Sequence, residues 1–204
     1  MAAPEAFDLS RESSATHAMY GTNNPRCAHV AKQTLAARRL VERGVRFIQI
    51  YSGGMENERS WDGHSDIESN HRQFAGETDQ PVAALLSDLK NRGLLDSTLV
   101  IWGGEFGRLP VAQRSKGNQA KGRDHNPHAF TVWMAGGGSK GGVHHGSTDP
   151  FGHKAENDKV SINDFHATLL HLLGIDHEKL TYRYSGREYR LTDVSGRVVD
   201  SVLA

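Results

Sequence analysis

The sequence has little of what marks several classes of protein. Its one cysteine, Cys27, excludes an internal disulfide. Lysine plus arginine and aspartate plus glutamate balance at 24 each, so net charge gives no reason to expect a nucleic-acid partner. No apolar run is long enough to span a membrane, and residues 1–10 lack the basic start and apolar middle of a signal peptide. The length of 204 residues suits one domain with a substantial core.

Glycine and histidine are the abundant residues, at 22 and 12 respectively. Both concentrate in the segments between the periodic stretches rather than within them. Loops rich in glycine, histidine and aspartate around a regular scaffold are what a metal or phosphate site requires. They are also what a protein with many loops shows, so composition leaves both interpretations open.

Alternating helix and strand patterns predict an α/β domain over residues 25–204, preceded by a polar arm or linker over residues 1–24. A long loop is expected over residues 55–79, because the apolar positions there are sparse. The order of helix, strand, helix, strand implies a mostly parallel sheet with flanking helices. The elements expected up to residue 102 are a helix from Pro25 to Gly44, a strand over Val45–Tyr51, a helix over Pro81–Asn91 and a strand over Thr98–Trp102.

Further elements are expected in the second half of the chain. A polar loop over 109–126 leads to a third strand over 130–135. Ser161 to Asp164 has the pattern of a helix cap, which predicts a helix over 165–173. Two short β-like runs are expected in the tail over 180–204, at Glu188–Leu191 and at Val198-Val199.

Three polar segments stand next to the predicted strands. The strand ending at Trp102 runs into a Gly-rich turn that carries Glu105 and Arg108. Ligands of open parallel sheets bind just beyond the carboxyl ends of strands, so an acid and a base here indicate a site. The alternative is an ordinary surface ion pair where the chain leaves the strand.

The other two segments supply carboxylates and imidazoles. Asp62 and His64 are two residues apart, so in an extended loop their side chains point to the same side. Asp124 and His125 precede the third predicted strand, next to Arg123. Carboxylate oxygens and imidazole nitrogens are good ligands for Zn²⁺ or Mn²⁺. Each segment alone is also a common composition for a polar turn.

Convergence of these segments at one sheet edge would create a metal site. The candidate ligands are Asp62, His64, Glu105, Asp124 and His125. Such a set suits one or two divalent cations, and two cations about 3.5–4 Å apart can clamp a displacement at phosphorus or sulfur. Arg108 or Arg123 could then hold a phosphate or sulfate with two hydrogen bonds.

The remaining histidines favour structural roles. His166 and His171 lie beside leucines on a predicted helix, where packing is the more common role. His144, His145 and His153 fall in a Gly-rich loop and are expected to be solvated.

The order of motifs resembles the DUF1501 family, bacterial proteins that are abundant in planctomycetes and related to the sulfatase and alkaline phosphatase superfamily. The similar stretches, in chain order, are Ser60-Trp-Asp-Gly-His64, Trp102-Gly-Gly-Glu-Phe-Gly-Arg108, Gly122-Arg-Asp-His-Asn126, Ala135-Gly-Gly-Gly138, His166-Ala-Thr-Leu-Leu-His-Leu-Leu-Gly-Ile175 and the ending from Leu180 through Arg190-Leu-Thr-Asp-Val194. The resemblance implies an alkaline-phosphatase-like α/β fold.

The resemblance also implies roles for particular residues. Asp62 and His64 look like the first ligand pair of the superfamily, and His125 resembles the ligand before a third strand. Glu105 falls where the superfamily has the aspartate of an Asp-His pair. Phe106 falls where the histidine would be, which removes one ligand of a second metal.

Family members are about twice as long, so the chain resembles their C-terminal portion, with the N-terminal half of the fold absent. That half would carry a nucleophile and an export signal, and family members are often periplasmic. The chain itself leaves its localisation undefined.

Two functions follow as expectations. The first is a metal-dependent hydrolase-like protein acting on sulfate or phosphate esters of small molecules or polysaccharides, with activity that this portion alone need not retain. Zn²⁺ or Mn²⁺ is the expected metal, with Ca²⁺ and Mg²⁺ as further options. In it Asp62, His64 and His125 would ligate one metal.

Glu105 would ligate or bridge a second metal, Asp124 would orient His125, and Arg108 and Arg123 would hold the anion. The alternative is a non-catalytic module that binds sulfated or anionic polysaccharide and has a degenerate metal site. A third expectation is self-association through an exposed sheet edge.

Overall fold

The computed structural model describes residues 3–52, 61–113 and 121–204, which form a mixed α/β structure. The chain divides into two compact units. The first comprises residues 1–98 and 108–125, and the second comprises residues 99–107 and 126–204. Each unit has its own helices and strands.

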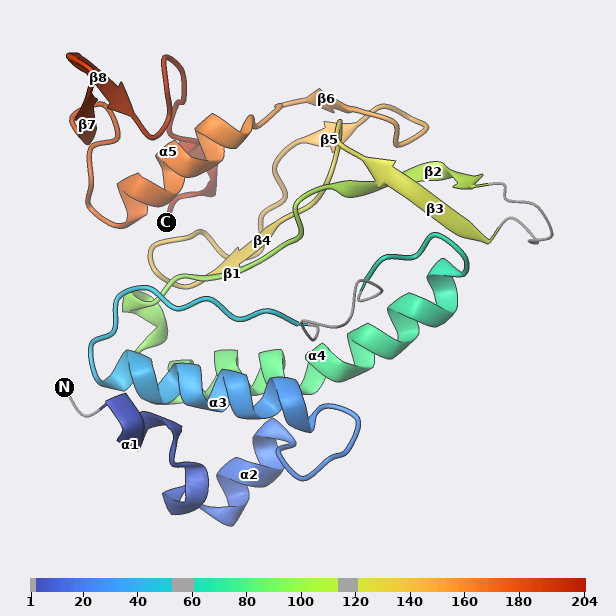
Figure 1. Ribbon diagram of the computed structural model, residues 1–204, viewed down its shortest axis with the longest axis vertical. Coiled ribbons are helices and arrows are strands. Elements are labelled where there is room, and N and C mark those ends of the chain that lie inside the picture. Colours follow the sequence, from blue (N-terminus) through green and yellow to red (C-terminus); the bar gives the residue numbers. More distant parts are fainter. Residues whose placement is uncertain (1–2, 53–60, 114–120) are drawn as a thin grey trace. The chain divides into compact units, whose positions relative to one another are not determined.

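Helices dominate the first unit, and α3 lies beside α4 (Figure 1). Apolar side chains from three helices meet in its core, including Tyr20, Leu35 and Leu89. The elements of this part of the chain are α1 (Ala3–Phe7), a 3-10 turn (Leu9–Arg11), α2 (Ser14–Tyr20), α3 (Ala28–Glu42), α4 (Ile67–Asn91) and a second 3-10 turn (Leu95–Ser97).

A buried ionic network fixes the N-terminal helices to α3 and α4. Arg38 is 2% exposed, and its guanidinium nitrogens lie 2.7 Å from a Glu12 oxygen, 2.7 Å from a Glu42 oxygen and 3.0 Å from Asp88 Oδ2. Arg39 also pairs with Glu12 and donates to the backbone oxygens of residues 5 and 6. Residues 3–20, expected to be an arm, are therefore fixed to the helices. Their release would leave buried charges unpaired, which costs free energy.

The ionised state of Glu12 depends on these arginines. Burial raises the pKa of Glu12, but hydrogen bonds from Arg39 and Arg38 outweigh this effect and bring the pKa below its usual value. Burial and the neighbouring Asp88 carboxylate raise the pKa of Tyr20, whose hydroxyl donates to Asp88 Oδ2 at 3.0 Å. The network thus favours the charged form of Glu12 and the protonated form of Tyr20.

Helix α4 begins well before the predicted start at Pro81. Asp66 caps it by accepting a hydrogen bond from the Ser69 N–H, and residues 67–79, expected to be loop, are helical. Phe74 and Thr78 are buried and extend the apolar stripe of the C-terminal half. Pro81 therefore lies inside the helix, where it removes one backbone donor. In the rest of the expected loop, residues 61–66 lie outside helices and strands, and residues 55–60 are not among the described residues.

The predicted strand over residues 45–51 is wrong. This segment is irregular, and Phe47 and Tyr51 are 75% and 70% exposed. A residue run with β propensity becomes a strand only when a neighbour pairs with it. The predicted helix over residues 25–44 is confirmed as α3.

The second unit contains the central predicted strands, but in a different arrangement. Strand β1 (Val100–Trp102) pairs antiparallel with β4 (Trp133–Ala135), and the Trp102 and Trp133 rings stack with centroids 6.5 Å apart. The described residues contain no parallel sheet. Parallel pairing needs a crossover connection, usually a helix, whereas the chain between β1 and β4 carries strands instead.

Those strands are β2 (Gly107–Gln113) and β3 (Gly122–Asn126), which pair with each other. They replace both ends of the polar loop expected over residues 109–126, and its middle, residues 114–120, lies outside the described residues. Most of both strands belongs to the first unit, where they carry the candidate site.

The rest of the second unit is built from short elements. The helix cap predicted at Ser161 is confirmed as a capping box with Asp164. Among the described residues no helix is long and apolar enough to cross a membrane. The elements are β5 (Ser147–Thr148), β6 (Ala155–Asn157), α5 (Ile162–Leu172), β7 (Thr181–Tyr184), β8 (Arg187–Arg190) and a 3-10 turn (Asp200–Val202).

Replacing Arg38 by methionine should destabilise the protein strongly. The change leaves buried carboxylates short of a cation, so the free energy of unfolding should fall by about 3 kcal/mol or more in urea denaturation. The control is Arg72→Met, since the Arg72–Glu68 pair is solvent-exposed and its loss should cost less than about 1 kcal/mol. Equal effects of the two changes would contradict a structural role for the network.

Candidate metal centre

The site begins with a close backbone approach between the loop over 62–66 and β3. Arg123 N donates to Gly63 O at 2.9 Å, Ile67 N donates to Lys121 O at 3.3 Å, and a parallel bridge joins Asp66 to Lys121. A Cβ atom at Gly122 would lie 1.7 Å from the backbone oxygen of His64. The approach therefore requires glycine at position 122.

This approach brings three side chains to one point. Asp62 Oδ1 lies 3.0 Å from His64 Nε2 and 3.2 Å from His125 Nε2, and the two Nε2 atoms lie 3.0 Å apart. Adjacent ligands on metal bonds of about 2.1 Å lie about 3.0 Å apart in an octahedron and about 3.4 Å apart in a tetrahedron. One carboxylate oxygen and two imidazole nitrogens are thus spaced as the ligands of one metal ion.

Gln113 on β2 fixes the proton of His64. Its Oε1 lies 2.6 Å from His64 Nδ1, and an amide oxygen can only accept a hydrogen bond. Nδ1 is therefore the donor in this contact, and Nε2 faces Asp62 and His125. A metal ligand needs this arrangement, in which Nδ1 carries a proton and Nε2 is left to bind the ion.

Arg108 orients the carboxylate. One of its terminal nitrogens donates to Asp62 Oδ1 and to the Trp61 backbone oxygen, both at 2.9 Å. Burial raises the pKa of Asp62, but hydrogen bonds from Arg108 and His125 outweigh it and bring that pKa below its usual value. Asp62 is therefore ionised and held in place by a charge-assisted hydrogen bond.

Trp61 anchors the loop that carries Asp62. Its backbone has φ of 63°, a left-handed conformation that a bulky residue adopts only under restraint. The restraint comes from its indole, which packs edge-on against His71, lies close to the buried Phe74 and donates to Ser52 Oγ at 2.9 Å. Burial, aided by the charge of Arg108, lowers the pKa of His71, which favours its neutral form.

Other predicted residues have different places. Asp124 Oδ1 accepts the His125 N–H at 2.7 Å and lies 3.9 Å from His64 Nδ1, so it does not belong to the three-atom group. Arg123 donates to Gly122 O and lines a cavity of about 500 Å³ beside the start of α4. Glu105 is exposed and belongs to the second unit, so its metal role stays a prediction.

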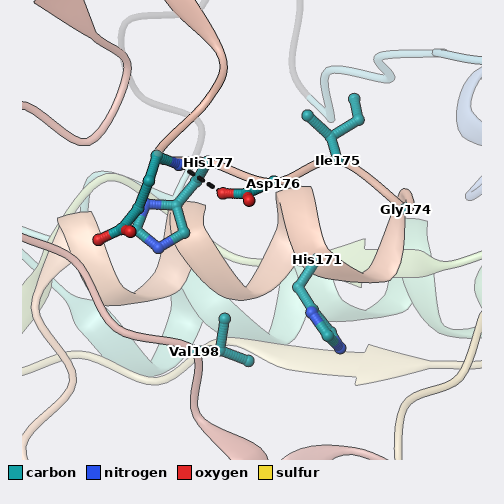
Figure 2. Close-up of a pocket in the computed structure, with 7 residues that line it drawn as sticks. His171, Gly174, Ile175, Asp176, His177 and Val198 are labelled. Atoms are coloured by element: carbon teal, nitrogen blue, oxygen red, sulfur yellow. Dashed lines mark hydrogen bonds between the residues drawn. The ribbon is translucent and has the colours of Figure 1, made fainter.

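The second unit has a cavity of its own. It measures about 440 Å³, and Figure 2 shows the side chains around it, with a dashed line where Glu178 N donates to Asp176 Oδ1 at 2.9 Å. His171 lines this cavity and is exposed, as is His166, so the expectation that both pack in the core is wrong. Among the described residues, ligand atoms converge as a possible metal site only at Asp62, His64 and His125.

The fold and the site define an α/β protein with a cluster of two histidines and one carboxylate that could hold a metal ion. The chain belongs to the DUF1501 family, described as proteins of unknown function, whose family model matches residues 1–203. No curated protein and no solved structure matches the chain. The family resemblance predicted from the sequence motifs is therefore confirmed.

The Gly122 requirement gives a direct test of how the site is assembled. Gly122→Ala should lower the free energy of unfolding by about 2–3 kcal/mol in urea denaturation, because the new methyl group must displace the backbone of His64. Gly141→Ala is the matched control, since a Cβ atom there meets nothing within 4 Å. Stability unchanged by Gly122→Ala would show that the loop and β3 do not approach as described.

Proposed function

We propose that the chain carries the metal site of a hydrolase acting on sulfate or phosphate esters. The observation that carries the proposal is the convergence of Asp62 Oδ1, His64 Nε2 and His125 Nε2. Three protein ligands with the remaining position open are typical of catalytic sites, whereas structural zinc sites are closed by four protein ligands.

The donor set narrows the choice of metal. Ca²⁺ and Mg²⁺ prefer oxygen ligands, whereas two imidazoles and one carboxylate suit Zn²⁺ or Mn²⁺. A divalent cation held there supplies Lewis acidity toward an ester oxygen and offsets charge that develops on it. Gln113 and Arg108 support this use by fixing the His64 tautomer and the Asp62 carboxylate.

Arg123 is the better candidate of the two arginines for holding a substrate anion. Arg108 is already committed to Asp62 and Trp61. Within the described residues, the Arg123 guanidinium donates one hydrogen bond, to Gly122 O, and it lines a cavity. A guanidinium can bind two oxygens of a sulfate or phosphate group at once. Arg123 would therefore orient the ester, while Arg108 positions a metal ligand.

Kinship with the sulfatase and alkaline phosphatase superfamily is part of the proposal. The order of the Asp62–His64, Glu105–Arg108 and Asp124–His125 motifs supports it. The parallel sheet of that superfamily would need strands beyond those described. A second metal, with Glu105 as its ligand, belongs to the same proposal.

Chelation tests the proposal. Protein loaded with Zn²⁺ or Mn²⁺ should hydrolyse nitrophenyl sulfate or nitrophenyl phosphate, lose this activity when the metal is removed, and regain it when the metal returns. His64→Ala should abolish the activity, because it removes one of three ligands. The matched control is His166→Ala, an exposed histidine on α5, which should leave the activity unchanged.

Two results would count against a hydrolase. One is hydrolysis that survives both chelation and His64→Ala. The other is a metal-loaded chain that hydrolyses neither ester, which would leave the metal site without this chemistry.

A further inference from the structure

The β7–β8 hairpin has one aromatic face and one charged face. Strand register places Tyr182 opposite Tyr189 and Tyr184 opposite Arg187. Because side chains alternate along a strand, these four share one face of the hairpin. The other face carries Thr181, Arg183, Glu188 and Arg190.

The hairpin holds this face in a defined shape. Its two turn residues, Ser185 and Gly186, both have positive φ, at 48° and 79°, as a tight two-residue hairpin turn requires. The Arg187 guanidinium lies 4.7 Å from the centre of the Tyr189 ring. The face is therefore a preformed platform rather than a set of independent side chains.

The platform is open to solvent. Tyr182, Tyr184 and Tyr189 are 69%, 62% and 40% exposed. Three large rings that stay in water on a two-stranded sheet contribute little to the stability of the fold. Clusters of exposed aromatic side chains mark binding surfaces. Tyrosine suits such a surface because it offers a rigid apolar ring and a polar hydroxyl.

The two faces of the hairpin differ in charge. On the charged face, Arg183 lies 4.0 Å from Glu188 and Arg190 lies 3.4 Å from Glu178, so carboxylates partly neutralise both cations. On the aromatic face the one charge is Arg187, and none of the described carboxylates forms an ion pair with it. The face therefore combines rings with one uncompensated cation.

We infer that the face formed by Tyr182, Tyr184, Arg187 and Tyr189 binds an acidic polysaccharide. Sugar rings present flat C–H surfaces that stack on aromatic rings, and their hydroxyls can bond to the tyrosine hydroxyls. Arg187 matches a sulfate or carboxylate substituent, which it can bind through two hydrogen bonds. The inference does not depend on the hydrolase site, since all four residues belong to the second unit.

Other macromolecules fit this face less well. Affinity for a nucleic acid comes mainly from several cations on phosphates, and this face has one. A stable protein interface needs about 800 Å² from each partner, which four side chains do not reach. A short run of sugar units matches both the size and the charge of the platform.

Affinity electrophoresis of the full chain in gels with dextran sulfate, neutral dextran or single-stranded DNA tests the inference. Dextran sulfate should retard the wild type most. Tyr182→Ala/Tyr184→Ala should weaken binding of dextran sulfate about tenfold or more, because two stacking surfaces are lost. Arg187→Gln should remove the preference for dextran sulfate over neutral dextran. The matched control, Arg183→Gln on the charged face, should behave as the wild type does.

Several results would overturn the inference. They are an unretarded wild type, equal losses from Arg183→Gln and Arg187→Gln, and retardation by DNA as strong as by dextran sulfate. Self-association that disappears in Tyr182→Ala/Tyr184→Ala, measured by sedimentation, would also overturn it, because the face would then bind another copy of the chain. Tyr182→Phe/Tyr184→Phe keeps the rings and should retain most of the binding.

Discussion

The candidate site depends on the close passage of a loop backbone along β3. The hydrogen bond from Arg123 N to Gly63 O sets the register. The missing side chain at Gly122 lets the backbones of the loop and of β3 approach closely. That register places Asp62 and His64 beside His125, which is 61 residues further along the chain than His64. A shift by one residue would turn His125 away from Asp62, because neighbouring side chains on a strand point to opposite faces.

Arginines stabilise the first unit in two places and by the same principle. Arg38 compensates buried carboxylates among the helices, and Arg108 compensates Asp62 at the site. In both cases burial alone would raise a carboxyl pKa, and the guanidinium reverses the effect. The two places differ in exposure. The Glu12 and Asp88 carboxylates beside Arg38 are almost fully buried, whereas Asp62 is partly exposed beside two imidazoles.

Local patterns in the sequence predicted α3, α5 and the core of the site, because periodic apolar residues, a capping box and an Asp-x-His motif are local signals. The prediction of a parallel sheet was wrong because strand pairing depends on residues far apart in the sequence. Strand β1 pairs antiparallel with β4. The roles of Gln113 and Gly122 carry no local signal, since both arise only when β2, β3 and the loop meet. Glu105 was predicted from its place after a strand, and its role stays a prediction.

Metal content is the measurement that tests the central claim most directly. Elemental mass spectrometry of the purified protein and of His64→Ala/His125→Ala, both shown to be folded, would report it. The geometry of Asp62, His64 and His125 predicts about one equivalent of zinc or manganese in the wild type, and none in the double variant. A folded wild type that takes up neither metal, or a double variant that keeps it, would contradict the assignment of this cluster as a metal centre.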